Sequence, residues 1–455
     1  MHPDTIAAIA TPLGGEGGIG VIRISGPGSL DIISSIFNSS SKKPFISHQI
    51  RHGWIVDNSR MVDQVVVSYM KAPRSYTGED VIEISCHGGG TILRNVLDLA
   101  IKAGARLASR GEFTKRAFLN GKLDLAQAEA VIDLIKAKTR EGSLFAASQL
   151  KGALSSRIKE TRGSLIRLLA EIEASIDFPD EIADIDYKTA KISLESVKTT
   201  IQQLINTADL GRIYREGITI AIAGRPNVGK SSLLNALVRA ERAIVTDEPG
   251  TTRDIIEETL NIEGVPARVL DTAGIRHTES STEKLGVDRA WKAIEGADMV
   301  LLLLDMSQPF SEQDQELIDK TKDSRRIIVF NKSDLSHKIN AKEAIKKAGK
   351  PLSVEVSAIN GDGVGGLEQL IYDTILSNNV VAKNTEVMVN LRQKESLLRA
   401  KEHIQSGLES MERQMQGDFL SIDLKGAVAA LGEVTGEVVS DEVIDRIFED
   451  FCVGK

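Results

Sequence analysis

The chain has few cysteines, no long apolar run and no excess of positive charge, and each shortage excludes a class of protein. Two cysteines, Cys86 and Cys452, among 455 residues exclude a disulfide framework and a cysteine-based metal cluster, and they predict a reducing, cytoplasmic environment. The longest apolar run, residues 299–304, falls far short of the ~20 residues that a membrane span needs. No basic segment followed by an apolar one opens the sequence, so we expect no signal peptide.

The charge balance bears on nucleic-acid partners. The formal net charge is −8 and the isoelectric point is near 5.6. A protein that grips nucleic acid mainly through its phosphates is usually basic. An RNA partner would therefore need a local basic patch, a groove between two subunits, or help from another protein.

The order of local patterns predicts a multidomain protein. β-Branched strand signals, Gly-rich turns and one helical stretch predict an α+β domain over residues 1–120. Apolar residues recur at helical spacing over residues 121–211, with one helix ending at Phe178-Pro179 and another spanning residues 187–210. Strands and helices alternate over residues 217–378, and residues 379–455 read as helical again. We therefore predict an α/β domain inserted into an all-α helical domain.

Residues 224–231 (GRPNVGKS) match the phosphate-binding loop G-x-x-x-x-G-K-[ST] and lie between a predicted strand and a predicted helix. In such a loop, backbone N–H groups curl around the phosphates and the helix N-terminus adds positive potential. Lys230 is expected to reach the β- and γ-phosphates, and the Ser231 hydroxyl to bind Mg²⁺. The predicted phosphate contacts are Asn227, Val228, Gly229, Lys230, Ser231 and Ser232.

Two further motifs follow predicted strands and predict that the base is guanine. Asp271-Thr272-Ala273-Gly274 can orient Mg²⁺ through water and offer the Gly274 N–H to the γ-phosphate. In Asn331-Lys332-Ser333-Asp334, the Asp334 carboxylate would accept the two N–H donors of guanine. Ser357 and Ala358 come after the next strand and predict a backbone contact to the guanine oxygen.

The residues that would activate water are less clearly marked. Thr251 and Thr252 lie where a mobile loop should bring a threonine to Mg²⁺, and Thr252 is favoured. Many small GTPases place a glutamine after Asp-Thr-Ala-Gly, but Ile275 stands here and cannot orient water. Glu283 is the substitute that the sequence offers. Its alternative interpretation is a solvated glutamate favoured by a helix dipole.

Taken together, these motifs resemble the MnmE (TrmE) family of tRNA-modification GTPases over essentially the whole chain. Beyond the GTPase motifs, the matching stretches are residues 22–26 (IRISG), 78–83 (GEDVIE), 111–114 (GEFT), 116–125 (RAFLNGKLDL) and 451–455 (FCVGK). Members have an N-terminal tetrahydrofolate-binding domain that also dimerises the protein, and a helical domain interrupted by the G domain. With the FAD-dependent MnmG (GidA) protein, they add a carboxymethylaminomethyl- or aminomethyl-type group to carbon 5 of the wobble uridine of certain tRNAs.

The resemblance implies a role for individual residues. It implies GTP contacts over Thr246, Asp247, Glu248, Pro249, Gly250, Thr251 and Thr252, K⁺ ligands at Asn227, Thr246, Glu248 and Thr251, and Mg²⁺ ligands at Ser231 and Thr252. Glu283 takes the place of the catalytic glutamate. Glu248 and Pro249 depart from other members, but the K⁺ contact there is expected from a backbone carbonyl. Val453 is a conservative variant in the tail.

The folate contacts implied by the resemblance are Arg23, Glu83, Lys122 and Lys455, with 5-formyltetrahydrofolate or a related tetrahydrofolate as the one-carbon source. A carboxylate can accept the paired N–H donors of a pterin, and a cation can meet the glutamyl tail or formyl oxygen. The alternative is that these residues are ordinary surface charges. Cys452 is either a small apolar residue in a packed tail or a thiol that attacks the uracil ring.

The competing function is a GTPase switch in ribosome assembly. Such a switch would carry a basic RNA-binding appendage, whereas the flanking segments here carry the Arg23 and Lys455 motifs instead. We therefore expect a homodimeric GTPase that acts on tRNA with MnmG, uses GTP, Mg²⁺, K⁺ and a folate, and has no membrane association.

Overall fold

The computed structural model describes residues 4–12, 17–39, 43–178, 180, 186–240, 257–271, 291–376, 387–413, 415 and 417–455. Contacts divide the chain into two compact units. One unit comprises residues 1–132, 149–198 and 399–455, and the other comprises residues 133–148 and 199–398. Among the described helices, none is both long and apolar enough to cross a membrane.

The first unit begins with a seven-stranded sheet in the order β3-β4-β5-β6-β2-β1-β7. Its strands are β1 (Ile6–Ile9), β2 (Ile19–Ser25), β3 (Phe37–Asn38), β4 (Gln49–Asp57), β5 (Arg60–Met70), β6 (Val81–His87) and β7 (Arg106–Leu107). Neighbouring strands run antiparallel except β1 and β7. The sequence patterns missed β4, because its apolar residues are interrupted by Arg51, His52 and Gly53.

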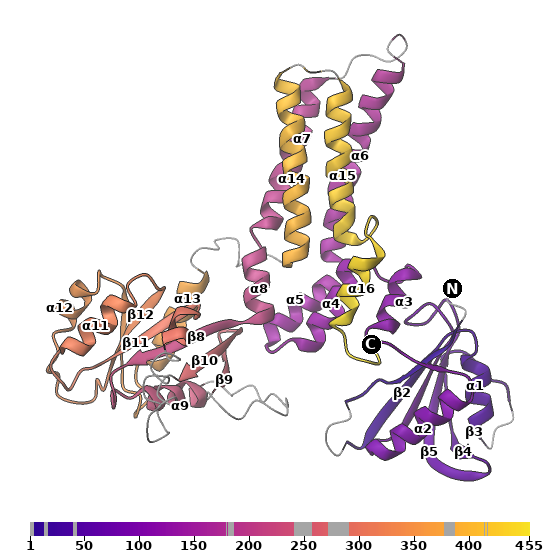
Figure 1. The fold of residues 1–455 in the computed structure, drawn as a ribbon, viewed down its shortest axis with the longest axis horizontal. Coiled ribbons are helices and arrows are strands. Elements are labelled where there is room, and N and C mark those ends of the chain that lie inside the picture. The colour runs from indigo at the N-terminus through magenta and orange to yellow at the C-terminus, as the bar shows by residue number, and fades with distance from the viewer. Residues whose placement is uncertain are drawn as a thin grey trace. The chain divides into compact units, whose positions relative to one another are not determined.

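Two helices, α1 (Ser29–Ile36) and α2 (Gly90–Lys102), cover one face of this sheet (Figure 1). Buried isoleucines and valines such as Ile22, Ile84 and Val67 pack beneath them. Because side chains alternate along a strand, Arg23 and Glu83 point to the opposite face. There α3 (Glu112–Leu119) packs Phe113 against Ile6 and Ala8 of β1.

Long helices make up the rest of the first unit. They are α4 (Leu125–Lys136), α6 (Ala153–Asp177), α7 (Tyr187–Ile205), α14 (Leu391–Glu412), α15 (Gly417–Thr435) and α16 (Asp441–Glu449), although α4, α7 and α14 extend across the unit boundaries. Ion pairs join neighbours, with Lys191 to Glu412 at 2.9 Å and Lys425 to Glu173 at 2.6 Å. The single helix expected over residues 187–210 is wrong, because α7 ends at Ile205 and Thr207 precedes α8 (Ala208–Glu216).

The second unit holds a six-stranded sheet in the order β13-β12-β11-β8-β10-β9. The strands are β8 (Ile218–Gly224), β9 (Glu257–Ile262), β10 (Val265–Asp271), β11 (Met299–Asp305), β12 (Arg326–Asn331) and β13 (Leu352–Val356). All neighbouring pairs are parallel except β9 with β10. Every residue of β11 is buried, as expected for a central parallel strand covered on both faces.

Helices α9 (Lys230–Ala240), α11 (Glu312–Lys320), α12 (Ala341–Lys347) and α13 (Val364–Leu376) flank this sheet (Figure 1). Helix α5 (Arg140–Leu150) lies largely in the same unit. The first strand, β8, lies between β10 and β11, so the strand order reverses there. In open α/β sheets, ligands bind outside the carboxyl ends of the strands at such a point.

Candidate guanine nucleotide site

The phosphate loop leaves β8 at Gly224 and enters α9 at Lys230, the strand–loop–helix arrangement expected from the sequence. Asn227 has a φ of 60° and Gly229 a φ of 98°, so the loop turns through the left-handed region twice. A Cβ on Gly229 would lie 2.2 Å from Nδ2 of Asn331, so glycine is needed for close packing as well as for conformation.

The loop carbonyls are held by side-chain donors. The Lys230 ammonium donates to the carbonyls of Gly224 at 2.9 Å and Arg225 at 2.8 Å. Lys332 Nζ donates to the Asn227 carbonyl at 3.0 Å, and Asn331 Nδ2 donates to the Val228 carbonyl at 2.8 Å. The predicted guanine motif therefore shapes the phosphate loop directly.

The residues predicted to recognise the base also meet at the ends of β12 and β13. The Ser357 hydroxyl donates to Asp334 Oδ1 at 2.6 Å, and the Ala358 N–H donates to Asn331 Oδ1 at 3.1 Å. Asp334 is exposed whereas Ser357 is buried. A buried hydroxyl thus orients an exposed carboxylate, which leaves Asp334 able to accept the N–H donors of a guanine.

The predicted metal ligands are only partly within the described residues. Ser231 and Ser232 are exposed in the first turn of α9, next to the buried Lys230, and a hydroxyl there fits a Mg²⁺ ligand of a phosphate loop. Asp271 ends β10 beside Ile222 of β8. Thr246, Asp247, Glu248, Pro249, Gly250, Thr251, Thr252, Thr272, Ala273, Gly274 and Glu283 lie outside the described residues, so their roles stay predictions.

Two buried carboxylates at this site were not identified from the sequence. Asp314, in the first turn of α11, lies 2.7 Å from Nε of Arg225 in the phosphate loop and has no exposed surface. Asp305, at the end of β11, lies 2.7 Å from Lys332 Nζ. The signal for Asp305 was its position after an apolar strand, since strand ends in a parallel sheet face the ligand.

A second cluster lies on the N-terminal sheet, opposite the face covered by α1 and α2. The Arg23 guanidinium donates to Glu83 Oε1 at 2.9 Å from Nε and 2.8 Å from Nη2. It also lies over the rings of Tyr76 and Phe113, at 5.3 Å and 5.6 Å from their centroids. Burial raises the pKa of the Tyr76 phenol despite its hydrogen bond to Thr114. The cluster offers a carboxylate edge beside aromatic faces.

The C-terminal tail runs back onto this cluster. Arg110 forms a β-bridge with Val453, and the Phe113 N–H donates to the Lys455 carbonyl at 3.2 Å. Arg23 Nη1 donates to the Gly454 carbonyl at 3.4 Å. Gly454 has a φ of 94°, and a Cβ there would lie 2.3 Å from the Ile9 carbonyl oxygen, so the tail fits closely against β1.

Two other predicted residues differ in their surroundings. Lys122 is exposed and its Nζ donates to the Pro73 carbonyl at 3.0 Å, so its contacts do not join it to Arg23 and Glu83. Cys452 is exposed, as a nucleophile requires, while burial raises the pKa of the Cys86 thiol to about 12. The packed-residue interpretation of Cys452 is therefore weakened.

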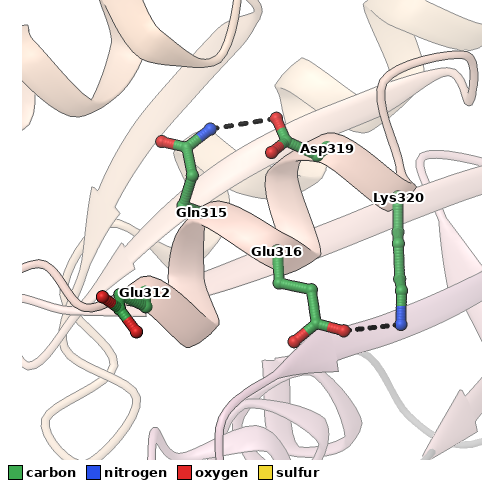
Figure 2. A pocket seen from close by; sticks show the side chains of 5 residues that line it. All are labelled: Glu312, Gln315, Glu316, Asp319 and Lys320. Atoms are coloured by element: carbon green, nitrogen blue, oxygen red, sulfur yellow. Dashed lines mark hydrogen bonds and ion pairs between the residues drawn. The ribbon is translucent and has the colours of Figure 1, made fainter.

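A metal cluster and the hollow along α11 were also considered as binding sites among the described residues. Among the described residues, no group of three or more His, Cys, Asp or Glu side chains is arranged to hold a metal ion. A hollow of about 520 Å³ lies along α11 and is lined by Glu312, Gln315, Glu316, Asp319 and Lys320 (Figure 2). Its side chains are joined in exposed pairs, Gln315 with Asp319 and Glu316 with Lys320. It contains none of the phosphate-loop residues.

Comparison with known proteins identifies the family. A family model described as "MnmE helical domain" matches residues 125–452, and one described as "GTP-binding protein TrmE N-terminus" matches residues 5–122. The chain belongs to the MnmE (TrmE) family. The tRNA modification GTPase MnmE of Alkaliphilus oremlandii (strain OhILAs) is 46% identical over 460 residues, covering 99% of each chain. That of Clostridioides difficile (strain 630) is 44% identical over 456 residues, also covering 99% of each.

The family expected from the sequence is therefore confirmed. Together with the phosphate loop and the guanine motif, family membership makes the chain a GTPase.

Proposed function

We propose that this chain hydrolyses GTP in a K⁺-dependent manner and, with the FAD-dependent MnmG protein, modifies carbon 5 of the wobble uridine of certain tRNAs. The group added is of the carboxymethylaminomethyl or aminomethyl type, and a folate carries its one-carbon unit. The relatives named above are tRNA modification GTPases, which supports tRNA as the substrate. The observation that carries the proposal further is the C-terminal tail, which lies against the Arg23–Glu83 pair.

The chemistry of that cluster suits a reduced folate. Glu83 is 31% exposed, so its carboxylate keeps free acceptor positions for the paired N–H donors of a pterin. Tyr76 and Phe113 supply aromatic surface, and Arg23 is already oriented by Glu83. A role as ordinary surface charges fits poorly, because the Arg23 side chain is only 13% exposed and holds the tail in place.

Calorimetry with 5-formyltetrahydrofolate tests this part of the proposal. The intact chain should bind, and Glu83→Ala should weaken binding by at least about tenfold, the size expected for losing a charge-assisted hydrogen-bonded contact. Exposed Glu160, which pairs only loosely with Arg157 at 3.9 Å on α6, offers Glu160→Ala as a matched control. No heat from the intact chain at high concentration would refute folate binding.

A homodimer is supported by the rest of the same sheet face. Ile50, Trp54 and Val66 on β4 and β5 are 73%, 38% and 37% exposed, and Ile19 on β2 is 71% exposed. Exposed apolar side chains gathered on one face mark an interaction surface. We assign this face to a second copy of the chain, which light scattering of Ile50→Asp against the unchanged protein would test.

The K⁺ requirement is supported by the phosphate loop. Phosphoryl transfer needs positive charge near the β–γ bridge, which many GTPases obtain from an arginine finger. The sequence shows no obvious arginine finger. Asn227 lies on this loop in a left-handed conformation, and its side chain is exposed, so its side-chain oxygen is available to K⁺. A K⁺ ion bound there would supply the positive charge near the β–γ bridge. With Na⁺ in place of K⁺, GTP should bind but turn over slowly.

The ribosome-assembly alternative predicts different consequences. A strain lacking this protein would then accumulate immature ribosomal particles and keep its wobble uridine modifications. No observation of this structure favours that function, whereas the tail beside Arg23 and Glu83 favours the folate-linked one.

A further inference from the structure

Asp305 lies outside the residues assigned to GTP binding above, yet it contacts one of them. It is the last residue of β11, the central strand, and is 5% exposed. Its neighbour in register on β12 is Asn331, and the Met306 N–H donates to the Asn331 carbonyl at 2.9 Å. The pairing of β11 with β12 therefore places Asp305 next to Asn331, the first residue of the predicted guanine motif.

The two carboxylate oxygens of Asp305 have different partners. Oδ1 accepts from the Ser307 N–H at 2.8 Å and from the Ser307 hydroxyl at 2.6 Å, while Oδ2 accepts from Lys332 Nζ at 2.7 Å. Burial alone would raise the pKa of Asp305. The hydrogen bonds from Lys332 and Ser307 outweigh burial and lower it, so the carboxylate is ionised at neutral pH.

Lys332 connects this carboxylate to the phosphate loop. Its Nζ donates to the Asn227 carbonyl at 3.0 Å as well as to Asp305, and its φ is 66°. A lysine side chain loses much rotational freedom when it is fixed in one position. Fixing it during folding removes that loss from the binding step, which is how pre-organisation increases affinity.

We propose that Asp305 is a positioning residue for guanine nucleotide binding, which holds the Lys332 ammonium against the Asn227 carbonyl and so joins the base site to the phosphate loop. Asp305 acts through Lys332 and does not touch the nucleotide. The proposal rests on the guanine site described above. The alternative is that Asp305 only stabilises the turn after β11 through Ser307.

Asp305→Asn separates these roles. If the amide oxygen that this change introduces stays on the two Ser307 donors, the amide nitrogen faces the Lys332 ammonium and two donors oppose each other. Ser307→Ala is the matched control, because it removes a hydrogen bond to the same carboxylate and leaves the Lys332 pair in place. Lys332→Met removes the ammonium while keeping an apolar stem.

Calorimetric titration of each variant and of Asp305→Asn/Lys332→Met with GDP and Mg²⁺ tests the proposal. Asp305→Asn should weaken GDP binding about five- to tenfold, the size expected for fixing one long side chain in advance, and Ser307→Ala less than about twofold. In the Lys332→Met background, Asp305→Asn should add less than about twofold, since its partner is gone. Asp305→Glu, which keeps the charge, should restore part of the affinity.

Three outcomes would overturn the proposal. They are an unchanged GDP affinity in Asp305→Asn, an equal loss in Ser307→Ala, and a full loss from Asp305→Asn in the Lys332→Met background. Thermal melting of each variant shows whether it is folded. If Asp305→Asn is unfolded, Asp305→Glu, which moves the carboxylate relative to Lys332, should weaken GDP binding more than Ser307→Ala does, and an equal or smaller loss in Asp305→Glu would overturn the proposal. If the unchanged protein does not prefer GDP to ADP, the guanine site itself is wrong, which is a separate result.

Discussion

Replacing Gly229 by alanine should damage the nucleotide site through one misplaced methyl group. Gly229 has a φ of 98°, and its added Cβ would lie 2.2 Å from Asn331 Nδ2. No side chain tolerates that distance, so the Asn331 amide must move. Asn331 is 2% exposed and its side chain makes hydrogen bonds to the Val228 carbonyl and the Ala358 N–H, both of which would be disturbed.

The magnitude follows from these contacts. A non-glycine residue in the left-handed region costs about 1–2 kcal/mol, which should lower the free energy of unfolding. Two disturbed hydrogen bonds at about 1 kcal/mol each make the binding-competent arrangement of the site about 2 kcal/mol less favourable, so GDP affinity should fall by about that amount. That loss corresponds to roughly a thirtyfold increase in Kd.

Calorimetry with GDP and thermal melting measure the two effects. Gly365→Ala is the control, because a Cβ at Gly365 in α13 meets nothing within 4 Å. The control should bind GDP as the unchanged protein does and should melt at the same or a slightly higher temperature, because alanine favours a helix more than glycine does. A Gly229→Ala protein that binds GDP normally would show that the packing of Asn331 against the loop does not shape the site.

Three further changes address other parts of the molecule. Asp334→Asn should reduce GTP affinity by at least about 2 kcal/mol in calorimetry, the cost of leaving guanine donors poorly matched. Glu283→Ala should bind GTP normally yet hydrolyse it about a hundredfold more slowly in a phosphate-release assay, as expected for losing a group that orients water. Burial would raise the pKa of Glu112, but hydrogen bonds from Arg106, Ser109 and Arg116 hold it at about 2. Stability from Glu112 is therefore present above pH ~4.5 and lost as the pH falls toward 2, and Glu112→Gln should flatten that part of the pH–melting curve.

Each of these expectations has a result that contradicts it. Unchanged GTP affinity in Asp334→Asn would remove its role in base recognition. A fully active Glu283→Ala would return Glu283 to a solvated surface residue. An unaltered acid transition in Glu112→Gln would show that its ion pairs with Arg106 and Arg116 contribute nothing to acid stability.

Short motifs with a strict geometry could be read from the sequence. The phosphate loop and the residues after β12 and β13 lie where their motifs predicted, because a parallel sheet brings its strand ends to one edge. The positions of two other features could not be predicted without the fold. The position of Asp305 at the site follows from its register beside Asn331 on the neighbouring strand. The position of the tail follows from the contact of Gly454 with Arg23, which is distant in the sequence.

Local patterns failed where interruptions or turns decide the structure. Strand β4 exposes the apolar side chains of Ile50 and Trp54 on one face and has Arg51 and Gly53 on the other, so apolar and polar residues do not alternate along it. The break between α7 and α8 comes at Thr207, whose hydroxyl donates to the Leu204 carbonyl and accepts from the Val389 N–H. That second partner belongs to a distant segment, which no local pattern contains.

We propose that this GTPase modifies the wobble uridine of tRNA. Nucleoside analysis of tRNA from cells that lack the protein tests it most directly, with the unchanged gene and a Glu83→Ala gene returned in parallel. We predict that carbon-5 modified wobble uridines disappear, that the unchanged gene restores them and that Glu83→Ala does not. A full set of these nucleosides in the cells lacking the protein would contradict the claim.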